Sequence, residues 1–384
     1  MENLKRYLKL KLPAGQSAFL WGPRKTGKST YLKQHFKNSL VYDFLNTDLF
    51  FEFTKNPSLL RQQLLAASVQ SLKHPVILDE VQKVPGILDE VHWLIENRKV
   101  QFILCGSSAR KLKRGQANLL GGRAWRYEMF PLVSTELPRV DLYKALNQGM
   151  VPAHYLSSDA KKSLKAYVQD YLKEEVFDEG LTRNIPAFSR FFEAMAYSHG
   201  QVINFSNIAR DCGVDSKTVQ EYYQILIDTL LGHRLEPFKQ RQDRSVIIKA
   251  PKFYLFDTGI AGAIVGRNIE KLKGEEFGRV FEHFIFMELT AYRGYKDLDF
   301  AVHYWRTKTG LEVDFVLGAG EIAIEIKGGR ADIRDIHGLK SFKEKYKPKK
   351  SIVVCQEKIA RIDRGIEILP WQEFLQRLWA GKII

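Results

Sequence analysis

The sequence predicts an α/β protein with a parallel sheet in its first third, a helical middle and a second α/β unit at its end. Short apolar segments alternate with helical segments up to about residue 140, a pattern typical of strands joined by right-handed crossovers. From about 160 to 235 helical segments follow one another, and beyond 250 strand-like segments return. We therefore predict three units, at residues 1–140, 141–250 and 251–384.

The first unit is predicted to alternate four strands with three helices. The strands are short apolar runs that end near glycine, serine or acidic residues, and the helices lie between them. The expected strands are 17–21, 39–44, 76–80 and 100–108, and the expected helices are 29–36, 57–72 and 86–97. Helices between parallel strands cover both faces of such a sheet.

The composition fits a folded chain, because 45% of the 384 residues are hydrophobic. Cys105, Cys212 and Cys355 lie far apart, so we expect neither a disulfide framework nor structural zinc. No apolar run approaches the ~18–20 residues of a membrane span, and the basic N-terminal segment lacks a signal-peptide core. The expectation is a soluble, cytoplasmic protein without a membrane partner.

The chain is basic, with 59 lysines and arginines against 44 acidic residues and a formal charge of +15. Residues 340–350 carry six lysines, and residues 239–252 carry five basic side chains. Such an excess suits DNA or another nucleic acid as a partner. A well-solvated basic surface explains it equally well, so charge alone leaves both interpretations open.

A phosphate-binding loop is predicted at residues 22–29, which read GPRKTGKS and match the Walker A pattern G-x-x-x-x-G-K-[ST] between a strand and a helix. Its glycines permit the tight backbone that turns amide groups toward phosphate oxygens. Lys28 is expected to reach the β- and γ-phosphates, and Ser29 to ligate Mg²⁺. The predicted nucleotide contacts in the loop are Gly22, Pro23, Arg24, Lys25, Thr26, Gly27, Lys28, Ser29 and Thr30.

The strand VILDE (76–80) ends in two carboxylates and fits a Walker B segment. Asp79 is predicted to hold the Mg²⁺ shell, and Glu80 to activate the attacking water as a general base. Without the loop, the two acids would be interpreted as solvated residues at a strand end. Ser107 or Ser108, after the next strand, is expected to orient that water or to sense the γ-phosphate, and a plain turn is the alternative. No NKxD motif for guanine is present, so ATP is the expected nucleotide.

An arginine finger is expected near residues 121–123, Gly-Gly-Arg. Arg123 is our prediction for a side chain that reaches the γ-phosphate, either within the chain or across a homo-oligomer interface. Arg110 and Arg126 are alternatives for the same role.

Residues 204–235 fit a helix-turn-helix within a winged-helix-like region. Ser206 and Ser216 are expected to cap its two helices, and Gly213 to form the turn. The basic stretch 239–252 would supply the wing. Lys217 is the main cation on the second helix, so a packing role without DNA contact stays open.

The last unit carries acidic residues on strand-like segments. Asp314 lies in EVDFVL, and Glu325 and Lys327 end the next segment, with Glu282 on a preceding helix. Asp and Glu-x-Lys on adjacent strands are the arrangement of the restriction-endonuclease-like PD-(D/E)xK fold. There Asp314 and Glu325 would share Mg²⁺ or Mn²⁺ and Lys327 would help to activate water. A salt-bridge network without metal is the alternative.

These segments together resemble the prokaryotic AAA-family ATPases that carry a C-terminal domain of unknown function (DUF4143). The first unit contributes GPRKTGKST, VILDEVQKV, the GSS after the fourth strand, and LLGGRAWRYEMFPLVSTEL. The later segments are KFYLFDTGI, GRVFEHFIFMEL, YWRTKTGLEVDFVL and IEIK, in the same order. GMVP at 149–152 departs from the GGYP-like turn usual in that family, and Glu174–Glu175 stand where an Arg-Asp-like pair is common.

The resemblance implies an ATP-binding, Mg²⁺-dependent ATPase. The basic stretches and the helix-turn-helix-like segment add the expectation that it acts on DNA or is regulated by it. The resemblance carries no established cleavage activity. Two other classes remain open: a nucleotide-switched scaffold or regulator, and a DNA-binding module whose nuclease-like domain is inactive.

Overall fold

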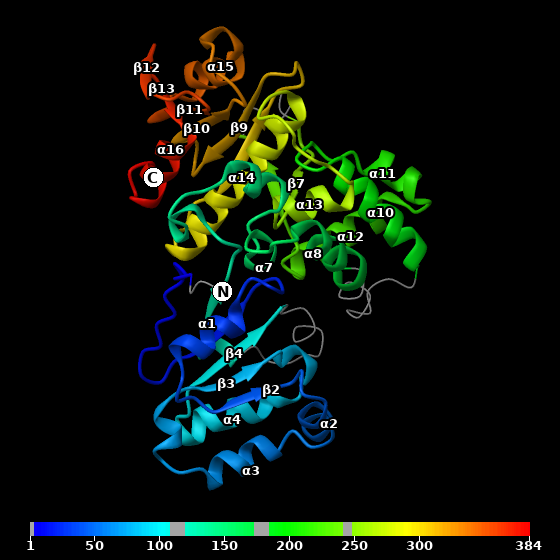
Figure 1. Ribbon diagram of the computed structural model, residues 1–384, viewed down its shortest axis with the longest axis vertical. Helices are drawn as coiled ribbons and strands as arrows, with labels where there is room; N and C mark the ends of the chain where they lie inside the picture. Colours follow the sequence, from blue (N-terminus) through cyan, green and yellow to red (C-terminus); the bar gives the residue numbers. More distant parts are fainter. Residues whose placement is uncertain (1–3, 108–119, 173–183, 241–247) are drawn as a thin grey trace.

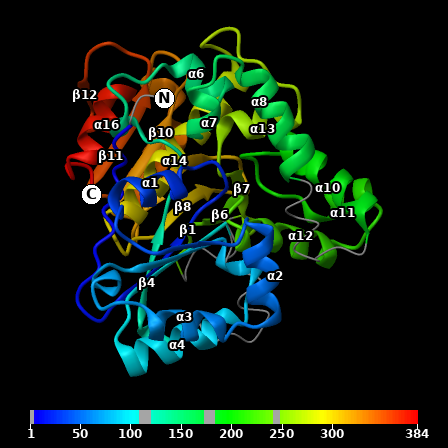
Figure 2. The ribbon, with the colours of Figure 1, turned by 60° about the horizontal axis from the view of Figure 1, so that its bottom comes forward.

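The computed structural model describes residues 4–107, 120–172, 184–240 and 248–384. In Figure 1 the first unit lies at the bottom, and the C-terminal sheet and the helical middle lie above it. Figure 2 shows helices α10 (Ile185–Tyr197), α11 (Phe205–Cys212) and α12 (Ser216–Asp228) projecting to one side of that sheet.

The first unit is built on a parallel sheet in the order β2-β3-β4-β1-β5. Its strands are β1 (Ser17–Trp21), β2 (Val41–Asp43), β3 (Val76–Asp79), β4 (Phe102–Gly106) and β5 (Ala124–Glu128). The helices are α1 (Lys28–His35), α2 (Thr47–Lys55), α3 (Leu59–Ala66) and α4 (Ile87–Arg98). The predicted parallel α/β unit is confirmed, although the helix expected over 57–72 ends at Ala66.

Alternate residues of each strand face opposite sides of this sheet, as strand geometry requires. Phe19 and Trp21 pack with α4 in one core, and Leu20 packs with Tyr31 and Leu32 of α1 in another. Burial on both faces leaves the carboxyl ends of the strands as the place where polar side chains gather.

The middle is helical, as predicted. It contains α6 (Leu142–Asn147), α7 (Pro152–Tyr155), α8 (Ala160–Ala166), a π-helical turn (Tyr167–Leu172) and α10 to α12. Asn204 caps α11 and Asp215 caps α12, so the predicted caps Ser206 and Ser216 are wrong. Each predicted serine lies inside its helix, one residue or more after the side chain that accepts the free amide hydrogens. Gly213 does form the turn, with a left-handed φ of 69°.

The last unit is a mixed sheet in the order β12-β13-β11-β10-β9-β8-β6-β7. Its strands are β6 (Gly232–Pro237), β7 (Lys252–Leu255), β8 (Val302–Arg306), β9 (Glu312–Leu317), β10 (Ile322–Ile326), β11 (Lys350–Cys355), β12 (Arg361–Asp363) and β13 (Ile366–Pro370). Its helices are α13 (Thr258–Ile264), α14 (Glu275–Tyr295), α15 (His337–Tyr346) and α16 (Trp371–Trp379). Strand β6 precedes residue 250, so the sheet begins within the segment expected to be helical.

The sheet is covered on both faces. Helices α14 and α16 pack on one face through Phe284, Leu289 and Phe374, and α15 packs on the other through Leu339 and Phe342. No described helix is both long and apolar enough to cross a lipid bilayer.

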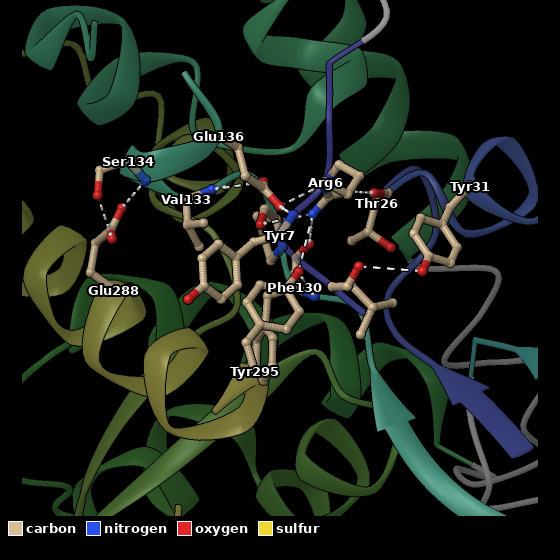
Figure 3. Close-up of polar contacts among 12 residues, drawn as sticks. Arg6, Tyr7, Thr26, Tyr31, Phe130, Val133, Ser134, Glu136, Glu288 and Tyr295 are labelled. Carbon is tan, nitrogen blue, oxygen red and sulfur yellow. Dashed lines mark hydrogen bonds and ion pairs between the residues drawn. The ribbon is translucent and has the colours of Figure 1, made fainter. Parts of the chain in front are cut away.

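A buried arginine joins the first and last units (Figure 3). Arg6 Nε donates to Glu136 Oε1 at 3.0 Å, and its other nitrogens donate to the carbonyls of Thr26, Phe130 and Pro131. The hydroxyl of Tyr295, the last residue of α14, accepts from Arg6 Nη2 at 3.2 Å. Charge-assisted hydrogen bonds to several acceptors hold the guanidinium in place.

Glu136→Ala should destabilise the protein by about 3–5 kcal/mol, because Arg6 would remain buried without its counter-ion. Chemical unfolding of the full chain measures this change. The control is Glu275→Ala, which removes an exposed pair with Arg279 at 4.0 Å. If the unfolding midpoints of both variants equalled that of the wild type, the contacts of Arg6 would not stabilise the fold.

Candidate functional site

The predicted phosphate loop connects the carboxyl end of β1 to the first residue of α1. Gly27 precedes α1 with a left-handed φ of 98°, which glycine adopts at little cost. A Cβ at Gly22 would collide with the carbonyl oxygen of Met129, so only glycine fits between β1 and the end of β5. Lys28 curls back over the loop, and its ammonium donates to the carbonyls of Gly22 at 2.6 Å and Pro23 at 3.1 Å. This geometry fits the predicted phosphate-binding loop.

The two side chains predicted to hold Mg²⁺ are in direct contact. Ser29 Oγ donates to Asp79 Oδ2 at 2.7 Å, across the gap between α1 and the end of β3. Hydroxyl and carboxylate oxygens are the ligands that Mg²⁺ prefers, so this pair fits the ion.

Glu80 lies at the end of β3 in a left-handed conformation with a φ of 55°. Its carboxyl group is buried, and burial raises its pKa, while the charges of Lys28 and Arg24 act in the opposite direction. A raised pKa brings a carboxylate closer to the range useful for a general base.

Sequence reasoning missed Gln82 as a member of this site. Its amide nitrogen Nε2 donates to Glu80 Oε2 at 2.5 Å and to Ser107 Oγ at 3.1 Å. Ser107 follows β4 and is buried, whereas Ser108 lies outside the described residues. The sequence signal that could have identified Gln82 was its position as a polar residue directly after Asp79, Glu80 and Val81.

Three further residues of the predicted loop and of the start of α1 have different surroundings. Thr26 Oγ1 donates to the carbonyl of Pro23 at 2.7 Å, which closes the turn. The Lys25 ammonium lies over the ring of Tyr167, 5.4 Å from its centre, so the helical middle contacts the loop. Thr30 is exposed on the first turn of α1.

Arg123 does not lie at this site, and its prediction as a finger within the chain is wrong. Its carbonyl accepts from the amide of Ser17, at the start of β1, and its guanidinium pairs with Glu96 on α4. The phosphate loop follows the other end of β1, about 16 Å away at the rise of a strand. Arg126 is exposed on β5, and Arg110 lies outside the described residues.

The C-terminal acids form a second polar cluster. Strands β9 and β10 are antiparallel with Ile324 opposite Phe315, so the next pair in register is Glu325 and Asp314. Asp314 Oδ2 accepts from the amide of Ile326 at 2.7 Å, and Glu325 Oε1 pairs with Lys327 at 2.9 Å. Burial and the neighbouring carboxylates raise the pKa of Asp314, and burial raises the pKa of Glu325 to about 7.

Lys252 neutralises this cluster from β7. Its ammonium is buried and contacts Glu282 Oε1 at 3.0 Å and Glu312 Oε1 at 2.7 Å, while the hydroxyl of Tyr254 also donates to Glu282. The placement of Lys252 in an exposed basic wing is therefore wrong. Glu282 is held by these contacts, and the described residues contain no group of three or more acidic, histidine or cysteine side chains arranged for a metal ion.

Two lysines of the basic stretch 340–350 make hydrogen bonds to backbone carbonyls of the chain. Lys343 donates to the carbonyls of Arg364 and Gly365, and Lys350 donates to those of Lys382 and Ile383. Lys217 is exposed on α12. Arg241, Arg244 and the Glu174–Glu175 pair lie outside the described residues.

Comparison with protein families divides the chain into three consecutive matches. Residues 15–137 match an AAA domain, residues 139–271 match a domain of unknown function (DUF8612), and residues 277–374 match another (DUF4143). The AAA and DUF4143 matches support the resemblance drawn from the sequence. None of the three matches identifies a restriction-endonuclease-like fold.

Three similar proteins are each described as uncharacterized. One from Mycobacterium bovis and one from Mycobacterium tuberculosis are each 24% identical over 309 residues, covering 77% of this chain and 66% of theirs. The chain thus spans slightly less than two thirds of their length. A protein of Haemophilus influenzae is 22% identical, covering 71% of this chain and 74% of its own.

Among solved structures, the Aeropyrum pernix Orc1 protein in complex with DNA is 13% identical, with a TM-score of 0.24 over 67% of this chain and 87% of that one. Similarity at this level carries no argument about function.

Lys252→Met should destabilise the protein by about 3–5 kcal/mol, because the buried carboxylates around it would lose their cation. The loss should shrink as the pH falls from about 8 to about 5, because Lys252 also acts on Asp314. Protonation of that carboxyl group, whose pKa burial raises, removes part of the uncompensated charge. Unfolding at several pH values measures this. Lys249→Met, at an exposed position near the start of β7, is the control, and equal stability of the two variants would contradict the prediction.

Proposed function

We propose that this chain binds ATP with Mg²⁺ and hydrolyses it. The observation that carries the proposal is the contact of Ser29 with Asp79 beside the curled Lys28, with Glu80 next along the chain. The AAA domain match covers the segment that contains these residues. Each of these side chains lies at the carboxyl edge of the parallel sheet, where open α/β sheets bind ligands.

The roles follow from charge and position. Lys28 neutralises the β- and γ-phosphates, and Ser29 and Asp79 hold Mg²⁺, which supplies further positive charge at the phosphates. Glu80 takes a proton from the water whose oxygen attacks the γ-phosphorus, and the bond to the β-phosphate oxygen breaks to give ADP and phosphate. Ser107, which Gln82 links to Glu80, would sense the γ-phosphate.

The wider organisation is also part of the proposal. We keep the division into units at residues 1–140, 141–250 and 251–384, with β6 joining the last sheet. Helices α11 and α12 form a helix-turn-helix, and Arg123 acts as a finger only across an interface between two copies.

A nucleotide-switched scaffold would use the same ATP site, and a turnover assay with and without DNA separates it from a DNA-stimulated ATPase.

Two substitutions should separate binding from hydrolysis. Lys28→Ala should abolish ATP binding, because the phosphates lose their main cation, while Glu80→Gln should keep binding and slow turnover by roughly 10²–10⁴-fold. Binding is measured with a fluorescent ATP analogue and turnover by phosphate release. Wild-type affinity in Lys28→Ala would refute the phosphate-loop assignment, and wild-type turnover in Glu80→Gln would remove Glu80 as the base.

The acidic cluster supports a second proposed function, a divalent-cation site of the PD-(D/E)xK type that acts on DNA. Glu325 Oε2 is buried and makes no hydrogen bond, and it lies on the residue opposite Asp314. Two buried carboxylates with raised pKa values favour either a proton or a cation. Lys327, which pairs with Glu325, would stabilise the negative charge of a phosphate group in the DNA backbone.

Mn²⁺ should bind to this cluster in the absence of nucleotide, and Asp314→Asn should weaken binding at least about tenfold by removing a charged ligand. Electron paramagnetic resonance titration measures the affinity, and a cleavage assay on linear, supercoiled and branched DNA tests the chemistry. Asp299→Asn makes the same change at an exposed position and should bind Mn²⁺ like the wild type. If Asp314→Asn and Asp299→Asn bound Mn²⁺ with equal affinity, the cluster would be a salt-bridge network and not a metal site.

A further inference from the structure

Gln82 has no role in the function proposed above, although it lies at the centre of the proposed hydrolytic site. It belongs to the 3₁₀ turn Val81–Lys83 that follows β3, and its side chain is buried. Buried amides are kept where their hydrogen bonds hold other groups in place. The two groups that Gln82 holds are Glu80, the proposed base, and Ser107, the proposed sensor.

The hydrogen bonds fix which way the amide is turned. Nε2 faces the Glu80 carboxylate, because the amide oxygen in that position would meet a like charge. Both amide hydrogens are thereby used, one on Glu80 and one on Ser107. Oε1 makes no hydrogen bond and lies against Gly106, where a Cβ would collide with it and approach the ring of Trp21 to 2.8 Å. Gly106 therefore makes room for the amide between the ends of β3 and β4.

The backbone at Glu80 explains why such a contact is needed. A non-glycine residue with positive φ is strained and persists only where its surroundings determine it. This conformation turns the chain out of the extended course of β3 at Glu80. The amide of Gln82 then holds the carboxylate by a short hydrogen bond from two residues along the chain.

We infer that Gln82 is a positioning residue for ATP hydrolysis, whose amide links the strand-end Ser107 to the carboxylate of Glu80 and sets the orientation of that carboxylate toward the attacking water. The inference rests on the proposed ATPase function. It adds a residue that touches neither nucleotide nor metal and acts through Glu80.

The test uses Gln82→Met, which keeps the length of the side chain and removes the amide. Turnover at saturating ATP should fall roughly 10–100-fold, while ATP affinity should stay near wild type. Gln82→Ala should give the same split between turnover and affinity if the larger truncation is tolerated. Gln63→Met, on the exposed face of α3, should leave both quantities unchanged.

A double-substitution cycle with Ser107→Ala tests the link itself. If the amide couples the two residues, Gln82→Met should cost less in the Ser107→Ala background than in the wild type. Additive effects, or wild-type turnover in Gln82→Met, would overturn the inference while leaving the ATPase intact. Faster turnover would overturn it as well, because the bond would then restrain Glu80. A wild type without turnover would remove the proposed function and this inference together.

Discussion

The Arg6 guanidinium is the contact on which the arrangement of the units depends. It is buried where the phosphate loop, the segment 130–136 and the end of α14 meet, and each of them presents an oxygen to it. Glu136 supplies the opposite charge and also accepts from the amides of Tyr7 and Val133. A buried polar group without its partner costs more than a formed pair contributes, so these segments have one arrangement in which all are satisfied. The nucleotide loop is thus fixed against the last unit as well as against its own sheet.

The parallel sheet then determines where the chemistry lies. Strands β3 and β4 are neighbours and end at the same edge, so Asp79, Glu80 and Ser107 come together without any sequence signal that links the two strands. Gln82 fits between them because Gly106 has no side chain. The loop after β1 reaches the same edge, which accounts for the contact of Ser29 with Asp79.

What the sequence could predict was local. The phosphate loop, the acids after β3 and the alternation of strands and helices depend on residues close along the chain, and the structure contains all of them. Arg6, Lys252 and Arg123 depend instead on distant partners. Arg6 meets Tyr295, Lys252 meets Glu312, and the register of β5 against β1 carries Arg123 to the far end of the sheet. No periodicity or spacing encodes such pairs, so a lysine in a basic stretch and an arginine after two glycines were both assigned to the wrong surroundings.

Helix α14 contacts both the residues around Arg6 and the acidic cluster of the last unit. Tyr295 ends α14 beside Arg6, and Glu282, thirteen residues earlier along the helix, accepts from Lys252 and Tyr254. At 1.5 Å per residue these positions are about 20 Å apart on one continuous helix. The phosphate-loop site and the acidic cluster differ in how their carboxylates are compensated, since Glu80 is held by a neutral amide whereas Glu282 and Glu325 already pair with lysines. A carboxylate held by an amide remains free to take a proton, whereas one paired with a lysine is already neutralised. For this reason the phosphate-loop site is the better suited of the two to proton transfer.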